Sequence, residues 1–210
     1  MMDDEKTRFS LKTELLQRIA ELGWQQSIFP SPDETSDRLV QQLEGLNPRD
    51  RPLSVNHLSS LTGSWRLIYA SRGTVVTRRL SSFREIGGGV KIIRVWQTLV
   101  ASHSSQISAA NCAEFALPFL GEWRLIADGV WRWGEDERVA QVSFGAFSVQ
   151  GTKPLGISSW SLPALKIPVW EFLRNEALWT TSYLDSQIRV GRGATGNLFV
   201  FCREEASTPN

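Results

Sequence analysis

The period of the hydrophobic pattern changes near residue 61, and this change constrains the fold more than any other feature of the chain. Before residue 61, apolar side chains recur every three or four positions, which is the spacing of one face of a helix. After it, apolar and polar side chains alternate in short runs, which is the pattern of β-strands. The sequence therefore predicts a helical lead-in over residues 1–50 and a mainly β domain over residues 61–205.

The first helix of the lead-in is indicated by an apolar stripe and a glycine stop. The stripe consists of Leu11, Leu15, Ile19 and Leu22. Gly23 is expected to end the helix in a left-handed conformation. A helix with one apolar face must pack that face on something larger.

A second helix is indicated by a start signal that begins at Ser31. Ser31 is the expected N-cap, Pro32 suits the first helical position, and Glu34 can reach back to the cap. Asn47-Pro48 is expected to end this helix. Its apolar stripe consists of Leu39, Val40, Leu43 and Leu46.

The β domain is predicted to contain many short strands separated by Gly-rich or polar breaks. Short strands joined by short turns favour an antiparallel barrel or sandwich. The acidic run at residues 135–137 is expected to be a solvated hairpin tip. The expected strands lie around residues 65–69 and at 75–84, 91–100, 111–117, 122–133, 138–149, 179–184, 187–191 and 197–203.

Residues 151–173 interrupt this pattern. Pro154, Pro163 and Pro168 exclude a central strand because proline cannot donate to the ladder. The same segment is too apolar for an idle loop, and long loops in compact domains are often lids or binding elements. Two interpretations remain open, namely extra core folded across an open barrel end and a functional portal. Trp160 and Trp170 are the predicted rim or lid residues.

Composition excludes several classes of function. The chain has 23 Lys and Arg against 22 Asp and Glu, so it has no electrostatic footprint for nucleic acid. Its apolar stretches are interrupted by charge or proline, so none is expected to cross a bilayer as a helix. Nine Trp stand beside ten Phe and two Tyr. This excess of Trp suggests a thick core, an apolar pocket or a membrane-facing rim.

The sequence contains no recognisable catalytic or metal-binding arrangement. Cys112 and Cys202 lack metal-ligand spacing, and His57 and His103 are the two imidazoles of the chain. There is neither a Gly-x-Ser-x-Gly elbow nor a phosphate-cradling loop. We therefore expect a non-catalytic protein with no cofactor and no metal site.

Gly63-Ser64-Trp65 resembles the Gly-x-Trp strand of lipocalin-type barrels. In those barrels the Trp closes one end, and a basic residue from a late strand lies across it. A guanidinium over an indole face contributes roughly 0.5–1 kcal/mol, or more when desolvated. The candidates for this contact are Arg189, Arg192 and Arg203.

Three segments together resemble the plastid lipid-associated protein family, also called fibrillins. The C-terminal part reads Tyr-Leu-Asp at 183–185, Arg-Val-Gly-Arg-Gly at 189–193 and Gly-Asn-Leu-Phe-Val at 196–200. Residues 43–48 resemble the Leu-Glu-x-x-Asn-Pro end of the family's helical lead-in, and residues 63–69 resemble its first strand. The middle of the chain matches loosely, at Asn111 and the strand after it. One departure is Gly191, where the family often has Ser.

The resemblance implies an antiparallel lipocalin-like barrel of about eight strands with an N-terminal helical pair. It also implies a hydrophobic ligand or partner, such as an isoprenoid, carotenoid, quinone or lipid, linked to photosynthetic membranes or lipid bodies. The acidic start Asp3-Asp4-Glu5 is unlike a signal or transit peptide. That start favours a cyanobacterial source and a location that is cytoplasmic or peripheral to the thylakoid membrane.

The predicted ligand-binding residues come from the apolar strand positions. Asp185 and Arg189 can pair across a turn, where they either orient a ligand's polar head or staple the last two strands; Arg192 belongs to the same motif. The alternative is a barrel filled by its own side chains, which acts as a membrane-surface or protein-interaction module. The candidate lining positions are Trp96, Phe144, Phe147, Trp179, Tyr183 and Phe199.

Overall fold

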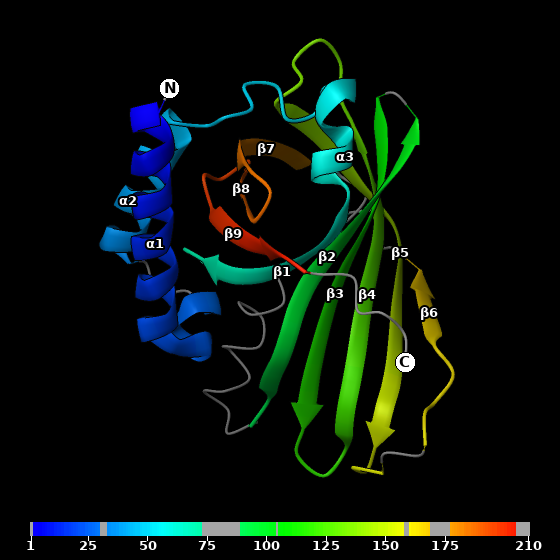
Figure 1. Cartoon of the computed structure of the whole chain (residues 1–210). Coiled ribbons are helices and arrows are strands. Elements are labelled where there is room, and N and C mark those ends of the chain that lie inside the picture. The colour runs from blue at the N-terminus through cyan, green and yellow to red at the C-terminus, as the bar shows by residue number, and fades with distance from the viewer. Residues whose placement is uncertain are drawn as a thin grey trace, which may run out of the picture.

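The computed structural model describes residues 2–29, 33–72, 89–103, 105–157, 160–168 and 177–204. The helices in these ranges are α1 (Met2–Ile28), α2 (Glu34–Gly45) and α3 (Leu58–Leu61), with a short 3-10 turn at Val55–His57 before α3. The strands are β1 (Gly63–Ala70), β2 (Lys91–His103), β3 (Gln106–Leu117), β4 (Gly121–Arg132), β5 (Val139–Pro154), β6 (Leu165–Pro168), β7 (Ala177–Leu184), β8 (Ile188–Gly193) and β9 (Leu198–Arg203). Figure 1 shows their arrangement.

The strands form one antiparallel sheet that closes into a ring. Their order is β4-β3-β2-β1-β9-β8-β7-β5-β6, and a further pairing of β4 with β5 closes the circuit. Within the described residues β6 pairs with β5 alone, so the ring itself consists of the other eight strands. The prediction of a mainly β, barrel-like fold with a helical lead-in is confirmed.

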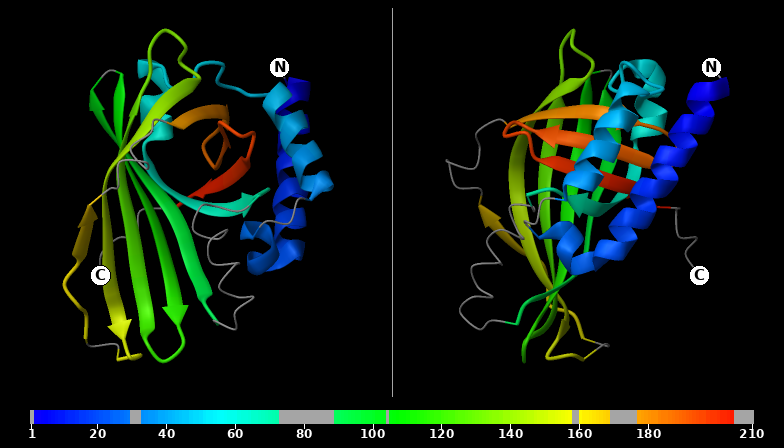
Figure 2. Two further views of the ribbon diagram at one scale, coloured as in Figure 1. Left: turned by 180° about the vertical axis from the view of Figure 1, so that it is seen from behind. Right: turned by 90° about the vertical axis from the view of Figure 1, so that its left-hand side faces the viewer.

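The ring is closed along part of its length. Residues 139–142 of β5 pair with β7, whereas residues 146–149 pair with β6. β1 likewise pairs with residues 96–99 of β2. Beyond these pairings β2 to β6 continue as an open sheet, which Figures 1 and 2 show as the long end of the molecule. We call residues 91–95, 113–117, 121–128, 146–154 and 165–168 the sheet extension, and the rest of the β structure the ring section.

Two apolar cores lie on the two faces of the ring section. The first fills the ring interior and includes Trp65, Leu67, Trp131 and Phe201, with α3 packed against it. The second lies between the ring and the pair α1 and α2, which cross β7 to β9 in Figure 2. Period-two alternation divides each strand between them, because on β9 Phe199 and Phe201 face the ring interior while Leu198 and Val200 face the helices.

The helix boundaries correct two details of the sequence prediction. Gly23 has the expected left-handed backbone, with φ 72°, but the chain resumes a helical path and α1 ends at Ile28. The N-cap of α2 is Asp33, whose carboxylate accepts a hydrogen bond of 2.9 Å from the backbone amide of Ser36. Ser31 and Pro32 lie outside the described residues, and α2 begins after them. Asp33 is favoured because it also accepts two hydrogen bonds from Arg18 of α1.

The 151–173 segment contains one strand that the sequence reasoning missed. β5 continues to Pro154, and β6 pairs with residues 146–149 at the edge of the sheet. An edge is the place where a strand tolerates proline, which explains how Pro168 ends β6. The expected strand at 75–84 and the lid candidate Trp170 lie outside the described residues.

Candidate binding site inside the ring

One end of the ring is closed by Trp65, α3 and Arg203. Trp65 is fully buried, and its indole N–H donates to the carbonyl of Leu61 at 2.8 Å. The guanidinium carbon of Arg203 lies 4.2 Å from the indole centroid. Arg203 also donates to the carbonyls of Thr62 and Ser60. The basic residue expected across Trp65 is therefore Arg203 of β9. The guanidinium carbon of Arg189, on β8, lies 5.2 Å from the same indole centroid.

Arg189 occupies the middle of the ring interior. It has no exposed surface, and its guanidinium carbon lies 4.4 Å from the Phe201 centroid and 5.6 Å from that of Trp131. Its Nη2 donates to Gln97 Oε1 at 2.6 Å, and Gln97 Nε2 donates to Asn111 Oδ1 at 2.6 Å. Burial, with a smaller contribution from the like charge of Arg203, lowers the pKa of Arg189 to about 9.

Several buried N–H groups in and around Arg189 have no hydrogen-bond partner in the part of the chain that the structure describes. Its Nε and Nη1, and the indole N–H groups of Trp131 and Trp179, have no hydrogen-bond partner among the described residues. The hydroxyls of Thr181 and Ser182 on β7 are buried and unpaired in the same way. The rings of Trp131 and Trp179 contact each other with centroids 5.7 Å apart. Buried polar groups are usually paired, so this cluster requires an explanation.

Aromatic side chains continue from this cluster toward the open end. Trp179 contacts Phe199 at 5.3 Å, and Phe144 stacks on Phe147 at 6.0 Å between centroids. All four are half-buried. Trp179 lies directly over β8 because position 191 is glycine: a Cβ there would stand 1.9 Å from Trp179 Cζ2. Gly191 thus serves packing within a strand, whereas the following turn uses Gly196, with φ 74°.

The inner face of the sheet extension carries the same apolar character. The register places Phe115 opposite Trp123, and Leu125 opposite both Ala113 and Val149. Phe115, Leu125 and Val149 are half-buried, as is Phe147 beside them. The ring interior therefore opens onto a partly accessible apolar surface, which we call the inner face.

The structure separates the predicted lining residues into two groups. Phe144, Phe147, Trp179 and Phe199 face the ring interior or the inner face. Tyr183 does not: a register shift between Thr181 and Tyr183 turns it toward the helices, where it joins their core. Trp96 does not either, because its neighbour Gln97 points inward to Arg189. Trp96 instead lies on the outer face, where the guanidinium carbon of Arg94 is 4.5 Å from the centroid of its ring.

Asp185 and Arg189 do not pair with each other. The Asp185 carboxylate accepts hydrogen bonds of 2.7 Å from the backbone amides of Gln187 and Ile188. It accepts a third, of 3.0 Å, from the ammonium group of Lys12 in α1. Burial favours the neutral acid, but these amides and Lys12 outweigh it and leave the pKa of Asp185 below its usual value. Asp185 thus holds the β7–β8 turn and attaches it to α1, which corresponds to the stapling alternative.

Arg192 also belongs to the junction between the ring and the helices. Its guanidinium donates twice to the Glu44 carboxylate of α2, at 2.8 and 2.7 Å. A bidentate pair of this kind fixes orientation as well as distance. Arg192 therefore has a counter-ion, whereas no carboxylate among the described residues forms an ion pair with Arg189 on the same strand.

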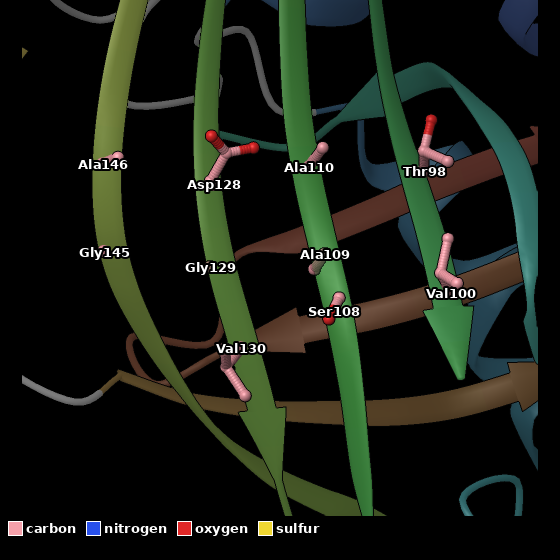
Figure 3. Close-up of a pocket in the computed structure, with 10 residues that line it drawn as sticks. All are labelled: Thr98, Val100, Ser108, Ala109, Ala110, Asp128, Gly129, Val130, Gly145 and Ala146. Carbon is pink, nitrogen blue, oxygen red and sulfur yellow. The ribbon is translucent and has the colours of Figure 1, made fainter. Parts of the chain in front are cut away.

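The outer face of β2 to β5 carries a shallow hollow of about 370 Å³. Figure 3 shows Thr98, Val100, Asp128 and Val130 among its lining residues. Val100 and Asp128 are exposed, whereas their strand neighbours Leu99 and Ala127 are buried in or beside the interior. The hollow is open to solvent and lacks convergent polar groups, so it is a weaker candidate than the ring interior.

Large apolar side chains are exposed at the far end of the sheet extension, where the turns after β3 and β5 lie (Figure 1). Phe119 is 95% exposed and Trp160 is 45% exposed. The two turns are joined because the amide of Leu155 donates to the carbonyl of Leu120 at 3.2 Å. The sequence reasoning identified Trp160 but missed the first turn, although two bulky apolar residues between Pro118 and Gly121 were a signal for it. We call this region the apolar tip; it consists of Phe119, Leu120, Leu155, Ile157 and Trp160.

The chain matches the PAP_fibrillin family model over residues 9–202. It belongs to this family. PAP_fibrillin proteins are lipid-associated structural proteins and are generally non-enzymatic. Comparison with curated proteins and with solved structures gave no match.

Two further features are absent from the part of the chain that the structure describes. None of its helices is both long and apolar enough to pass through a bilayer. In the same part of the chain no group of three or more His, Cys, Asp or Glu is arranged to hold a metal ion. The lipid association of the family therefore directs attention to the inner face and to the apolar tip.

Proposed function

We propose that this PAP_fibrillin protein is a non-catalytic binder of a hydrophobic molecule, which lies along the inner face where the ring opens into the sheet extension. Isoprenoids, carotenoids, quinones and lipids are the candidate ligands, at photosynthetic membranes or lipid bodies. The proposal depends chiefly on one observation: aromatic side chains lead from the ring core to the inner face, and Phe144, Trp179 and Phe199 of the ring and Phe147 of the inner face are half-buried.

The physical basis is the transfer of apolar surface from water to this face. Burial contributes about 25 cal/mol per Å², so a ligand burying a few hundred Å² gains several kcal/mol before the entropy cost of binding. The centre of the ring is filled by Trp65, Trp131 and Phe201, so a long ligand follows the inner face and does not pass through the ring.

Ligand titration followed by Trp fluorescence tests this function. A panel containing a carotenoid, a quinone and a fatty acid should produce saturable, one-to-one quenching with at least one member. The double variant Phe144→Ala and Phe147→Ala should weaken that binding, whereas Val100→Ala on the outer face should not. Absence of saturable quenching across the panel would contradict the proposal.

The apolar tip supports a second candidate function, attachment to a lipid surface. Its side chains protrude from two joined turns, and Trp favours the boundary between water and lipid. Two backbone amides of the tip already donate within it, that of Leu155 to the carbonyl of Leu120 and that of Trp160 to the carbonyl of Ile157. Internal pairing of this kind lowers the cost of bringing a turn to an apolar phase. The expected contact with the thylakoid membrane would be made here.

Flotation with uncharged phosphatidylcholine vesicles tests the second function separately. The native chain should float with the vesicles, and the double variant Phe119→Ser and Trp160→Ser should remain in the soluble fraction. Val100→Ser is the matched control, because Val100 is exposed but lies on the outer face. Equal flotation of all three proteins would remove the tip as the attachment point.

A further inference from the structure

We propose that Arg189 is an internal anchor for a carboxylate, so that the ligand of the inner face is an amphiphile with an acidic head and an apolar tail, such as a long-chain fatty acid. This inference rests on the proposed function, because it adds the chemistry of the head group to a site whose apolar part is already described.

The charge of Arg189 is the first argument. Its side chain is fully buried, its hydrogen bond goes to the neutral amide of Gln97, and no described carboxylate forms an ion pair with it. Arg192 on the same strand shows the usual solution, a bidentate pair with Glu44. A buried charge without a counter-ion is costly, and the surrounding rings compensate it in part through their π faces. An anion supplied by a ligand completes the pairing.

The supply of donors is the second argument. Arg189 Nε and Nη1 and the indole N–H groups of Trp131 and Trp179 all lack acceptors among the described residues. The Trp131 ring contacts both the Arg189 guanidinium and the Trp179 ring, so these donors belong to one cluster. A carboxylate accepts about four hydrogen bonds and donates none. An alcohol brings a donor of its own, and a ketone brings no charge, so both complement this cluster less well.

The position of the cluster fits an amphiphile. Trp179 contacts Trp131 on one side and Phe199 on the other, so the donors border directly on the aromatic surface. Phe144 packs against the same interior and stacks on Phe147, which leads to the sheet extension. These donor atoms are buried, so a head group reaches Arg189 only if the side chains around it move apart. Its tail then lies along the inner face, with the closed end of the ring behind the head.

Three ligands with one tail test the head-group chemistry: hexadecanoate, hexadecanol and methyl hexadecanoate, titrated at pH 7.5 with Trp fluorescence as the readout. The native chain should bind hexadecanoate about tenfold or more tightly than the other two, which is the ratio expected for a hydrogen bond to a charged group. Gln97→Glu places a carboxylate beside Arg189 with almost no change of shape. This variant should bind all three ligands with similar affinity.

Further variants make the result independent of one substitution. Arg189→Met should also abolish the preference for the acid, while Arg132→Met, which removes an exposed arginine from the outer edge of β4, should retain it. Equal binding of the three ligands by the native chain would overturn the carboxylate anchor and leave the proposed function intact. A preference for hexadecanoate that survives in both Gln97→Glu and Arg189→Met would overturn it as well. Failure of all three ligands to bind the native chain would contradict both proposals.

Discussion

The ring section and the sheet extension are built from the same strands, yet they have different physical characters. In the ring section β2 to β5 face an opposite wall made of β1 and β7 to β9, and most of their large inward side chains, such as Leu99 and Trp131, are buried. In the sheet extension the same alternation continues without that wall, and its large inward side chains Phe115, Leu125 and Phe147 are half-buried. The comparison shows that one strand pattern produces a core or a partly exposed apolar surface according to what lies opposite it.

The ends of the two regions differ in the same way, because one end is buried and the other is exposed. The ring section ends in Trp65, covered by Arg203 and α3, where the indole N–H and the guanidinium are both hydrogen-bonded. The sheet extension ends in the apolar tip, where Phe119 and Leu155 have left-handed backbones, with φ 65° and 54°, and exposed side chains. Bulky residues rarely adopt this conformation. Stability is therefore concentrated at one end, and exposed apolar surface at the other.

Two matched Phe→Ala truncations, one in each region, should give the largest difference in the free energy of unfolding. Phe201→Ala in the ring section should lower the free energy of unfolding by about 3–5 kcal/mol, because it leaves a cavity in a packed core. Phe147→Ala in the sheet extension should cost less than about 2 kcal/mol, since its side chain is already part-exposed. Urea denaturation measures both values. Equal losses would mean that the two regions are packed alike.

A side chain added at position 191, where Trp179 packs on Gly191, should cause the next largest loss of stability. Gly191→Ser restores the residue often found in the family, but its Cβ would overlap the Trp179 ring. We expect a loss of about 1–3 kcal/mol, as for other overpacked cores. Gly193→Ser is the control, because a Cβ there would meet Phe199 at an ordinary 3.8 Å. A thermal melt of each variant decides whether this packing is specific to position 191.

Acid should weaken the junction between α1 and α2. A hydrogen bond from Arg18, opposed by burial and aided by Ser36, holds the pKa of Asp33 well below its ordinary value of 3.8. The stability from this carboxylate is therefore complete above that ordinary value and is lost as the pH falls through the lower pKa of the folded state. Asp33→Asn should cost about 1 kcal/mol or less at pH 7, because Arg18 is part-exposed. The difference between the urea midpoints of the variant and the native chain should be smaller at pH 3 than at pH 7, and should close only below the pKa of Asp33 in the folded state.

The smallest effect is expected at the apolar tip. Phe119→Ser should change the free energy of unfolding by less than about 0.5 kcal/mol, because the side chain is almost fully exposed. The same variant is expected to weaken flotation with vesicles. A large loss of stability would show that the tip is part of the core and not an exposed surface.

Much of the fold was predictable because period-two alternation is strong in β1, β2 and β9. The ring, the helical pair and the closing contact on Trp65 all follow from local patterns and from the family resemblance. The edge strand β6 was missed because Pro163 and Pro168 argue against a strand, and that argument holds for central strands but not for edges. The N-cap was misplaced because the advantage of Asp33 comes from Arg18, fifteen residues away on another helix.

The candidate site was less predictable for a physical reason. Alternation determines which residues share a face but not which face is inside, so Trp96 was placed inward although Gln97 occupies that side. A register shift in β7, invisible in the sequence, moved Tyr183 to the helix side. The lack of a counter-ion for Arg189 among the described residues is a property of its three-dimensional surroundings, because Asp185 is near enough in the sequence to suggest one.

The long strand β5 has a mechanical consequence. It runs without interruption from the residues that pair with β7 to the turn that carries Leu155, and its register against β4 shifts by one residue at Gly145. A load applied at the apolar tip therefore reaches the ring section along the paired strands β3, β4 and β5, and β5 carries it to the pairing with β7 that closes the ring. Gly145 is the natural pivot along that route, since an extra residue without a side chain bends most easily.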